Sequence, residues 1–167
     1  MKPRIFTTRN IAYTGLLTAL MYVIGLITIF IGTATGSSII QFSDVILFSL
    51  FGILANPVLI VSSIVSSILL DATSGMFIYI PITALIKILI IITLIITYKL
   101  TKIKPLSIVV AYLWVFLYVL FAYLLFDESY AIREAIIDTI QYGVTVIFAS
   151  IFISLYDFKK IKILKEN

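Results

Sequence analysis

Six apolar segments separated by short polar stretches dominate the sequence. They are residues 11–31, 42–55, 57–70, 78–98, 106–126 and 131–155. A helix needs about 20 apolar residues to cross roughly 30 Å of hydrocarbon, and four of the six segments reach that length. Because 62% of the chain is hydrophobic and only 12% is charged, a water-soluble fold is excluded. The sequence predicts an all-α integral membrane protein with six transmembrane helices in one domain, residues 1–167.

The basic residues follow an alternating pattern along these segments. Ten of the 12 Lys and Arg residues lie before the first segment, between the fourth and fifth, or after the sixth. With six spans these places fall on one side of the membrane, and Lys and Arg mark the cytoplasmic side. The other side receives Asp71, Asp127, Glu128 and Glu134, with Arg133 as its basic residue. We therefore expect both termini in the cytoplasm.

Several kinds of chemistry are missing from the chain. The sequence has neither Cys nor His, which excludes disulfides, thiol nucleophiles, imidazole bases and Cys/His zinc sites. It also lacks the Gly-x-x-x-x-Gly-Lys-Ser/Thr loop that holds ATP phosphates. We expect no enzymatic activity, no metal and no cofactor.

The second and third segments are shorter than a membrane span. Each has about 14 residues, or roughly 21 Å of helix, and Asn56-Pro57 between them is typical of a tight turn before a helix. Small and polar residues, 32–38 and 71–75, lie at their outer ends. We expect a pocket that opens to the outside, with these two loops as lids. The alternative is that the short helices thin the bilayer.

Lys87 lies near the middle of the fourth segment, where an ionised Lys costs about 2.5–3.5 kcal/mol. Tyr79, Thr83 and Lys87 are spaced four residues apart and share one helix face. We expect this face to point inward, where Lys87 has a partner or a function. The alternative is that Lys87 extends toward the cytoplasmic interface, which begins about eleven residues away.

A second polar face lies on the sixth segment and consists of Glu134, Asp138, Gln141 and Thr145. Asp44 and Asp71, at the outer ends of the second and third segments, complete a set of carboxylates. These groups could neutralise Lys87 or accept hydrogen bonds from a ligand. In the alternative interpretation, Asp44 caps its helix and Asp71 faces outer water.

Two further patterns have both a binding and a packing interpretation. Trp114 lies deep in the fifth segment, one turn before Tyr118, where an aromatic pair could stack on a planar ligand or pack in the bundle. Ala12, Gly15 and Ala19 form a stripe of small residues on the first segment, which permits close approach of a helix from this chain or from another subunit.

These features together resemble the S components of energy-coupling factor (ECF) vitamin transporters. The resemblance depends on four motifs in order: Gln41-Phe-Ser-Asp44, Leu50-Phe-Gly52, Asp71-Ala-Thr-Ser-Gly75 and Tyr79-Ile-Pro-Ile-Thr-Ala-Leu-Ile-Lys87. The last is similar to the branch associated with hydroxymethylpyrimidine or pyridoxine-type vitamins. Gly15-Leu-Leu-Thr-Ala19 is similar to the family's Ala-xxx-Ala docking motif, with Gly in place of the first Ala.

The resemblance implies a six-helix membrane protein of the prokaryotic cell membrane that binds a vitamin from outside. It also implies that two outer loops close over the vitamin, and that the first span docks on a membrane coupling subunit driven by two cytoplasmic ATPases. The expected substrate-binding residues are Gln41, Asp44, Asp71, Tyr79, Thr83, Lys87, Trp114, Glu134, Asp138 and Gln141; the expected docking residues are Ala12, Gly15 and Ala19.

Two other classes remain open at this point. A structural subunit of a bacterial wall-elongation complex would suit the length and the number of spans, but it gives no reason for Lys87 at mid-depth. In an ion-coupled secondary transporter, Lys87 and Asp138 would gain and lose protons during transport. Inverted repeats would support that class, and comparison of residues 1–75 with 76–167 reveals none.

Overall fold

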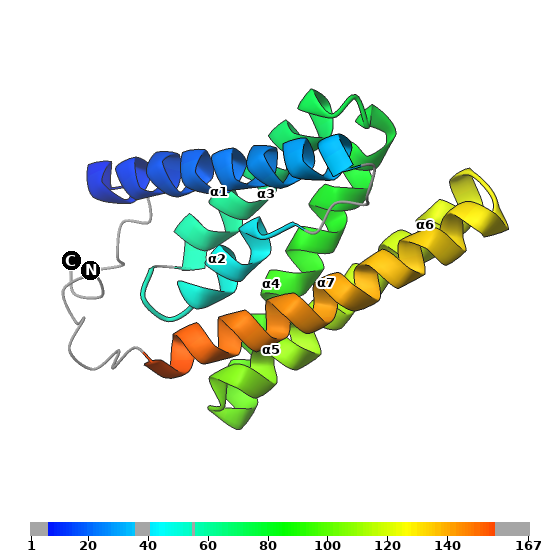
Figure 1. Cartoon of the computed structure of the whole chain (residues 1–167). Helices are drawn as coiled ribbons and strands as arrows, with labels where there is room; N and C mark the ends of the chain where they lie inside the picture. The colour runs from blue at the N-terminus through cyan, green and yellow to red at the C-terminus, as the bar shows by residue number, and fades with distance from the viewer. Residues whose placement is uncertain (1–6, 36–40, 55, 156–167) are drawn as a thin grey trace.

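The computed structural model describes residues 7–35, 41–54 and 56–155, and nearly all of them are helical (Figure 1). The elements in chain order are α1 (Thr8–Thr35), α2 (Ser43–Ser49), α3 (Asn56–Thr73), η1 (Phe77–Tyr79), α4 (Ile80–Thr101), α5 (Lys104–Tyr112), η2 (Leu113–Phe116), α6 (Leu117–Leu125) and α7 (Glu128–Leu155). The all-α class expected from the sequence is confirmed for these residues.

Five stretches of the described chain are long and apolar enough to cross a membrane. They are Thr8–Phe30, Asn56–Thr73, Phe77–Thr101, Lys104–Leu125 and Glu128–Leu155. In the fourth of these, α5, η2 and α6 follow one another without a break. The five stretches correspond to the expected spans 11–31, 57–70, 78–98, 106–126 and 131–155, most of which the structure extends by several residues.

The expected second span, residues 42–55, is much shorter in the structure. α2 has seven residues, and the chain then turns through Gly52, whose φ is 87°. Glycine adopts this left-handed conformation without steric cost, so the helix ends here although the residues around it are apolar. The expectation of a 14-residue helix was wrong, because hydropathy does not register a change of backbone conformation.

The third span is longer than expected. Residues 71–73 continue α3, and the Thr73 and Ser74 hydroxyls donate to the carbonyl oxygens of Leu69 and Leu70 at 2.9 and 2.7 Å. The turn follows at Gly75, with a φ of 74°. The segment 71–75 is therefore mainly the end of a helix. The other expected lid, 32–38, lies partly outside the described residues.

α1 and α3 lie side by side and run in the same direction (Figure 1). The Ser62 hydroxyl donates to the carbonyl oxygen of Thr14 at 3.1 Å, and further along Leu70 packs over Gly25. A Cβ on Gly25 would lie 2.3 Å from Leu70 Cδ1, so glycine permits this close approach. Because the two helices are parallel, the chain between them has to return through the bundle, and α2 lies on that return.

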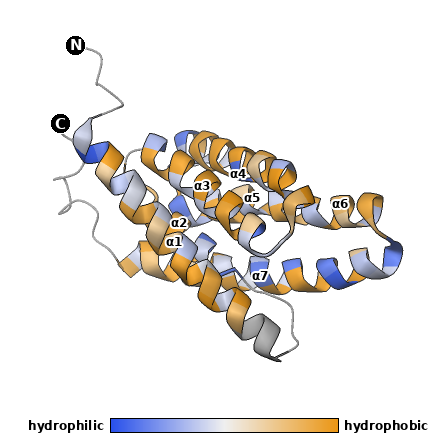
Figure 2. Cartoon of the chain, turned by 90° about the horizontal axis from the view of Figure 1, so that it is seen from above, coloured by the Kyte–Doolittle hydropathy of each residue, from blue (hydrophilic) through white to orange (hydrophobic). Residues whose placement is uncertain are grey.

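The outside of the bundle is more apolar than part of its inside. Hydrophobic side chains cover most of the helices, whereas hydrophilic residues gather on the first half of α7 (Figure 2). Several buried residues are polar or charged; they include Asp44, Lys87, Asp138, Gln141 and Thr145. Such an arrangement is typical of a protein whose outer surface contacts lipid.

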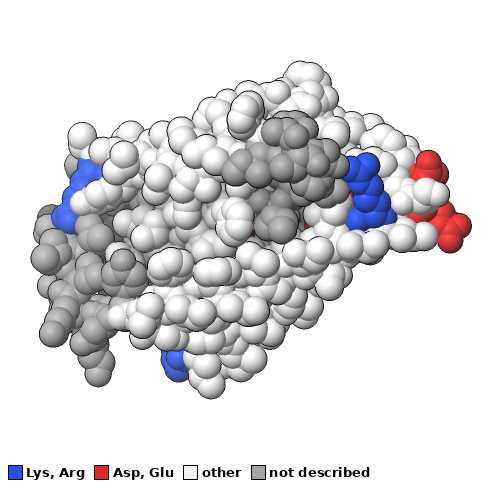
Figure 3. Space-filling model, in the orientation of Figure 1, with Lys and Arg blue, Asp and Glu red and all other residues white. Residues whose placement is uncertain are grey.

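The two ends of the bundle carry opposite charge. Arg9, Lys99 and Lys102 lie at the end where α1 begins and α4 ends, whereas Asp127 and Glu128 lie at the turn between α6 and α7 (Figures 1 and 3). This asymmetry matches the alternation seen in the sequence. The remaining basic residues of that pattern before residue 7 and after residue 155 lie outside the described residues.

Candidate binding cavity

A cavity of about 510 Å³ lies in the half of the bundle where α1 and α3 end and α4 and α7 begin. Its lining contains nine of the ten residues expected to bind substrate: Gln41, Asp44, Asp71, Tyr79, Thr83, Lys87, Glu134, Asp138 and Gln141. Gln41 lies just before α2, and the others come from α2, α3, η1, α4 and α7, so segments far apart in the sequence build one site. Its volume falls within the range of small-molecule sites, about 300–1,000 Å³.

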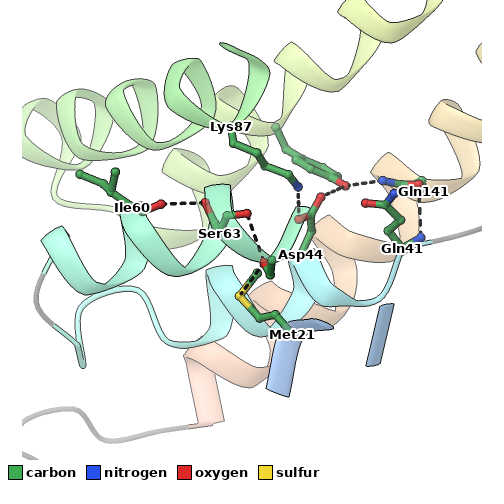
Figure 4. Close-up of polar contacts among 9 residues, drawn as sticks. Met21, Gln41, Asp44, Ile60, Ser63, Lys87 and Gln141 are labelled. Atoms are coloured by element: carbon green, nitrogen blue, oxygen red, sulfur yellow. Dashed lines mark hydrogen bonds and ion pairs between the residues drawn. The ribbon is translucent and has the colours of Figure 1, made fainter. Parts of the chain in front are cut away.

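Lys87 forms an ion pair with Asp44 at the cavity (Figure 4). Each side chain is only 2% exposed. An ionised Lys at membrane depth is costly unless a charge of opposite sign is close, and α2 supplies that charge to α4. The sequence indicated that Lys87 needs a partner, and the structure identifies Asp44 as that partner.

A chain of hydrogen bonds extends from this ion pair to α7. The Tyr112 hydroxyl donates to Asp44 Oδ2 at 2.8 Å, and Gln141 Nε2 donates to the Tyr112 oxygen at 2.9 Å (Figure 4). The backbone N–H of Gln41 donates to Gln141 Oε1 at 3.3 Å. The network joins α2, α4, α5 and α7, and it fixes the polar groups on this side of the cavity.

The polar face of α7 descends along the cavity wall. Glu134 is partly buried, Asp138 is 3% exposed and Gln141 is 6% exposed. Asp138 Oδ2 has no hydrogen-bond partner among the described residues. Thr145, one turn beyond Gln141, is buried but does not line the cavity. The expected polar face is therefore present, and its first three members reach the cavity.

Another part of the wall comes from the end of α3, from η1 and from the start of α4. Tyr79 is buried, and its ring lies 6.2 Å from the rings of both Tyr118 and Phe126. The Tyr79 hydroxyl and Asp71 Oδ2 are without a hydrogen-bond partner in the described chain. This wall therefore combines an aromatic surface with polar side chains.

Trp114 is the expected binding residue that the structure does not bring to the cavity. It lies in η2, is 36% exposed, and its Nε1–H donates to Thr93 Oγ1 at 2.7 Å. A 3₁₀ segment has about 3.0 residues per turn instead of 3.6, which rotates the side chains around the helix axis. Val115 and Tyr118 line the cavity from this part of the chain instead.

The small residues of α1 lie away from the cavity. Ala12, Gly15 and Ala19 are all exposed, and a Cβ on Gly15 would meet nothing within 4 Å. In the described part of the chain this stripe is therefore not used for packing against another helix. α1 packs on α3 and α2 through its other side, where Leu17 and Met21 are buried.

Several cavity residues were not expected from the sequence. Tyr130, Arg133, Ser74 and Met76 line the cavity, and Tyr112 holds Asp44. Tyr130 lies one turn before Glu134, so the spacing of the α7 face could have identified it. Tyr112 gave no such signal, because a single tyrosine in an apolar segment has the same pattern as one that only packs.

The family model described as ECF-type riboflavin transporter, S component, matches residues 5–165. The chain belongs to this family. The search of curated proteins and the search of solved structures each gave no match. The resemblance to S components is thus confirmed at the level of the family, and the match leaves the hydroxymethylpyrimidine or pyridoxine branch undecided.

An S component is the substrate-capture subunit of an ECF vitamin transporter and not an enzyme. The protein therefore binds a small-molecule vitamin, associates with the subunits of an ECF module, and lies in the prokaryotic cell membrane as a multi-pass protein. A wall-elongation subunit and an ion-coupled transporter are no longer needed to explain the chain.

Proposed function

We propose that this S component captures a B-vitamin or vitamin precursor of the hydroxymethylpyrimidine or pyridoxine class from outside the cell for ATP-driven uptake. The observation that carries the proposal is the cavity, in which carboxylates, a tyrosine wall and the Lys87–Asp44 pair come together. A small heteroaromatic ring offers flat faces for the tyrosines and polar edges for the carboxylates.

The expected binding residues have different roles in this proposal. Asp71, Glu134 and Asp138 accept hydrogen bonds from the ligand, Thr83 and Gln141 fix its orientation, and the Lys87–Asp44 pair forms a rigid polar floor. Tyr79 stacks against the ring. Trp114 is left out of the ligand site because it lies in η2, outside the cavity lining.

Riboflavin is the second candidate ligand, because the matched family is described as the S component of a riboflavin transporter. Its ring system is also planar and heteroaromatic, so the tyrosine wall suits it as well. The two candidates differ in size and in the hydrogen bonds that they offer, which binding measurements can separate.

We further propose that the exposed stripe of Ala12, Gly15 and Ala19 docks on the membrane coupling subunit of an ECF module, with two cytoplasmic ATPases supplying the energy. Small side chains allow the partner's helix to approach closely. The basic end of the bundle would then face the cytoplasm, with both termini there, and the cavity would open to the outside.

A ligand screen tests the proposal. Purified protein in detergent, without ATP, is heated with single B-vitamins and precursors, and the midpoint of thermal unfolding is measured. A ligand that binds the folded state raises this midpoint, because it stabilises the folded state. At a hundredfold excess over Kd the stabilisation is about 2.7 kcal/mol. Absence of stabilisation by every compound would contradict the proposal.

A further inference from the structure

The charged residues that line the cavity do not balance. The four acidic ones are Asp44, Asp71, Glu134 and Asp138, and the two basic ones are Lys87 and Arg133. Among these described residues the acidic side chains outnumber the basic ones by two. Lys87 is already paired with Asp44, so the remaining three carboxylates share the cavity with one cation.

Three side-chain oxygen atoms of the cavity residues have no hydrogen-bond partner among the described residues. They are Asp138 Oδ2, Asp71 Oδ2 and the Tyr79 hydroxyl, and all three residues line the cavity. Asp138 is 3% exposed and Tyr79 is 7% exposed, so bulk water reaches neither side chain freely. A buried polar atom without a hydrogen bond is costly, and a buried carboxylate more so. Because all three residues line the cavity, an occupant of the cavity can supply hydrogen-bond partners to them.

The polar groups around Lys87 already form hydrogen bonds with one another. Lys87 donates to Asp44, and Gln141 donates to the Tyr112 oxygen. An anionic ligand would have to displace Asp44 to pair with the Lys87 ammonium, and the Tyr79 hydroxyl offers it only a neutral donor. A cationic ligand would meet Asp138 without breaking any contact that the structure records.

We propose that the ligand is a planar ring that carries a protonated amine, and that Asp138 accepts this group together with Asp71 and Glu134. The inference rests on the proposed function, since it specifies the ligand of that same cavity. Glu134 and Asp138 lie one turn apart on α7, so the amine meets two carboxylates as it moves inward. The ring then lies against the wall that contains Tyr79 and Tyr118.

Two series of matched compounds test the charge preference on unmodified protein. Pyridoxamine, pyridoxine and 4-pyridoxic acid share one ring and differ in an aminomethyl, hydroxymethyl or carboxylate group. The aminomethyl and hydroxymethyl forms of 4-amino-2-methylpyrimidine are a second pair. By titration calorimetry on the full chain in detergent, we expect the aminomethyl compound of at least one ring to bind at least tenfold more tightly than its hydroxymethyl counterpart, and the carboxylate to bind most weakly.

A variant then assigns the preference to one residue. Asp138→Asn keeps the size of the side chain and removes its charge, and it should reduce the preference for the amine to threefold or less. Asp127→Asn is the matched control, because Asp127 is exposed, does not line the cavity, and accepts a hydrogen bond from the Tyr130 N–H that Asn can also accept. The control should keep the full preference.

The outcomes separate this inference from the proposed function. A preference for the aminomethyl compound below tenfold on both rings overturns the inference. So does a carboxylate that binds as tightly as pyridoxamine, and so does an Asp138→Asn variant with an unchanged preference. Binding of riboflavin with no binding of either series also overturns it but leaves vitamin capture intact. If neither series, riboflavin nor any other B-vitamin binds, the proposed function and the inference both fail. The measurements on unmodified protein decide the charge preference even if the variant does not fold.

Discussion

The two ends of this bundle fill their interiors in different ways. At the basic end, aromatic rings pack edge to face, with Phe48 against Tyr112 at 5.2 Å and Phe51 against Tyr98 at 5.4 Å. At the acidic end, the interior is a cavity lined by carboxylates and tyrosines. The network around Asp44 lies where the two regions meet.

This difference indicates that the basic end contributes mainly to stability and the acidic end mainly to ligand selectivity. Packed aromatic and aliphatic side chains stabilise the basic end through buried apolar area. The cavity end leaves polar atoms without partners, and an occupant can supply those partners. Variants at the boundary should therefore affect both properties, whereas variants on the outer face of α1 should affect neither.

The largest effect is expected for Asp44→Asn. The substitution leaves Lys87 buried without a counter-charge, which typically costs about 3–5 kcal/mol. Lys87→Met leaves Asp44 buried without a counter-charge, so it should also lower the free energy of unfolding, and it should weaken ligand binding. The free energy of unfolding in detergent measures both. The double variant should recover part of the loss, and an Asp44→Asn protein as stable as the parent would contradict the structural role of the pair.

Tyr112→Phe should have the next largest effect. It removes the hydroxyl that donates to Asp44 and accepts from Gln141, and loss of buried hydrogen bonds of this kind costs about 1–3 kcal/mol. Tyr98→Phe is the matched control in the packed end and should change the free energy of unfolding by less than about 0.5 kcal/mol. Equal losses of unfolding free energy in the two variants would show that the hydrogen bonds of Tyr112 add no stability beyond that of packing.

Gly25→Ala is expected to cost about 1 kcal/mol, at the low end of overpacking effects, because the flexible end of Leu70 can move aside. Leu70 also lines the cavity, so ligand affinity should fall as well. Gly15→Ala is the control, since its new methyl group meets nothing within 4 Å. A comparison of unfolding midpoints and ligand Kd in the two variants tests whether α1 and α3 pack as closely as described.

Gly15→Leu should have the smallest effect on the isolated protein, within about 0.5 kcal/mol. We expect unchanged ligand affinity but loss of the coupling subunit and ATPases in a pull-down. Val23→Leu, at another exposed position on α1, should retain the complex. If the Gly15→Leu protein still recovers the ECF module, the proposed docking face is elsewhere.

Much of the site followed from helical spacing. Lys87, Thr83 and Tyr79 share a face on α4, and Glu134, Asp138 and Gln141 share one on α7, because four-residue spacing places side chains together whatever the tertiary structure. Which carboxylate pairs with Lys87 did not follow, since Asp44 and Asp71 come from different helices and only packing decides their distances.

Other features depended on local backbone that hydropathy does not register. The end of α2 near Gly52 and the 3₁₀ turn that moves Trp114 out of the cavity lie within apolar segments, where every residue favours burial or lipid equally. Tyr112 was missed for a related reason. The same side chain is suitable for packing and for hydrogen bonding, and its partner lies 68 residues away in the sequence.

The ion pair between α2 and α4 also constrains the order in which the chain can assemble. α2 has seven residues and carries a buried carboxylate, whereas its counter-charge is synthesised 43 residues later. A helix so short is not held in a bilayer by its own hydropathy. We therefore expect the second helix to reach its final place only after the fourth has been made, so that a chain released before Lys87 leaves α2 accessible to a water-soluble labelling reagent.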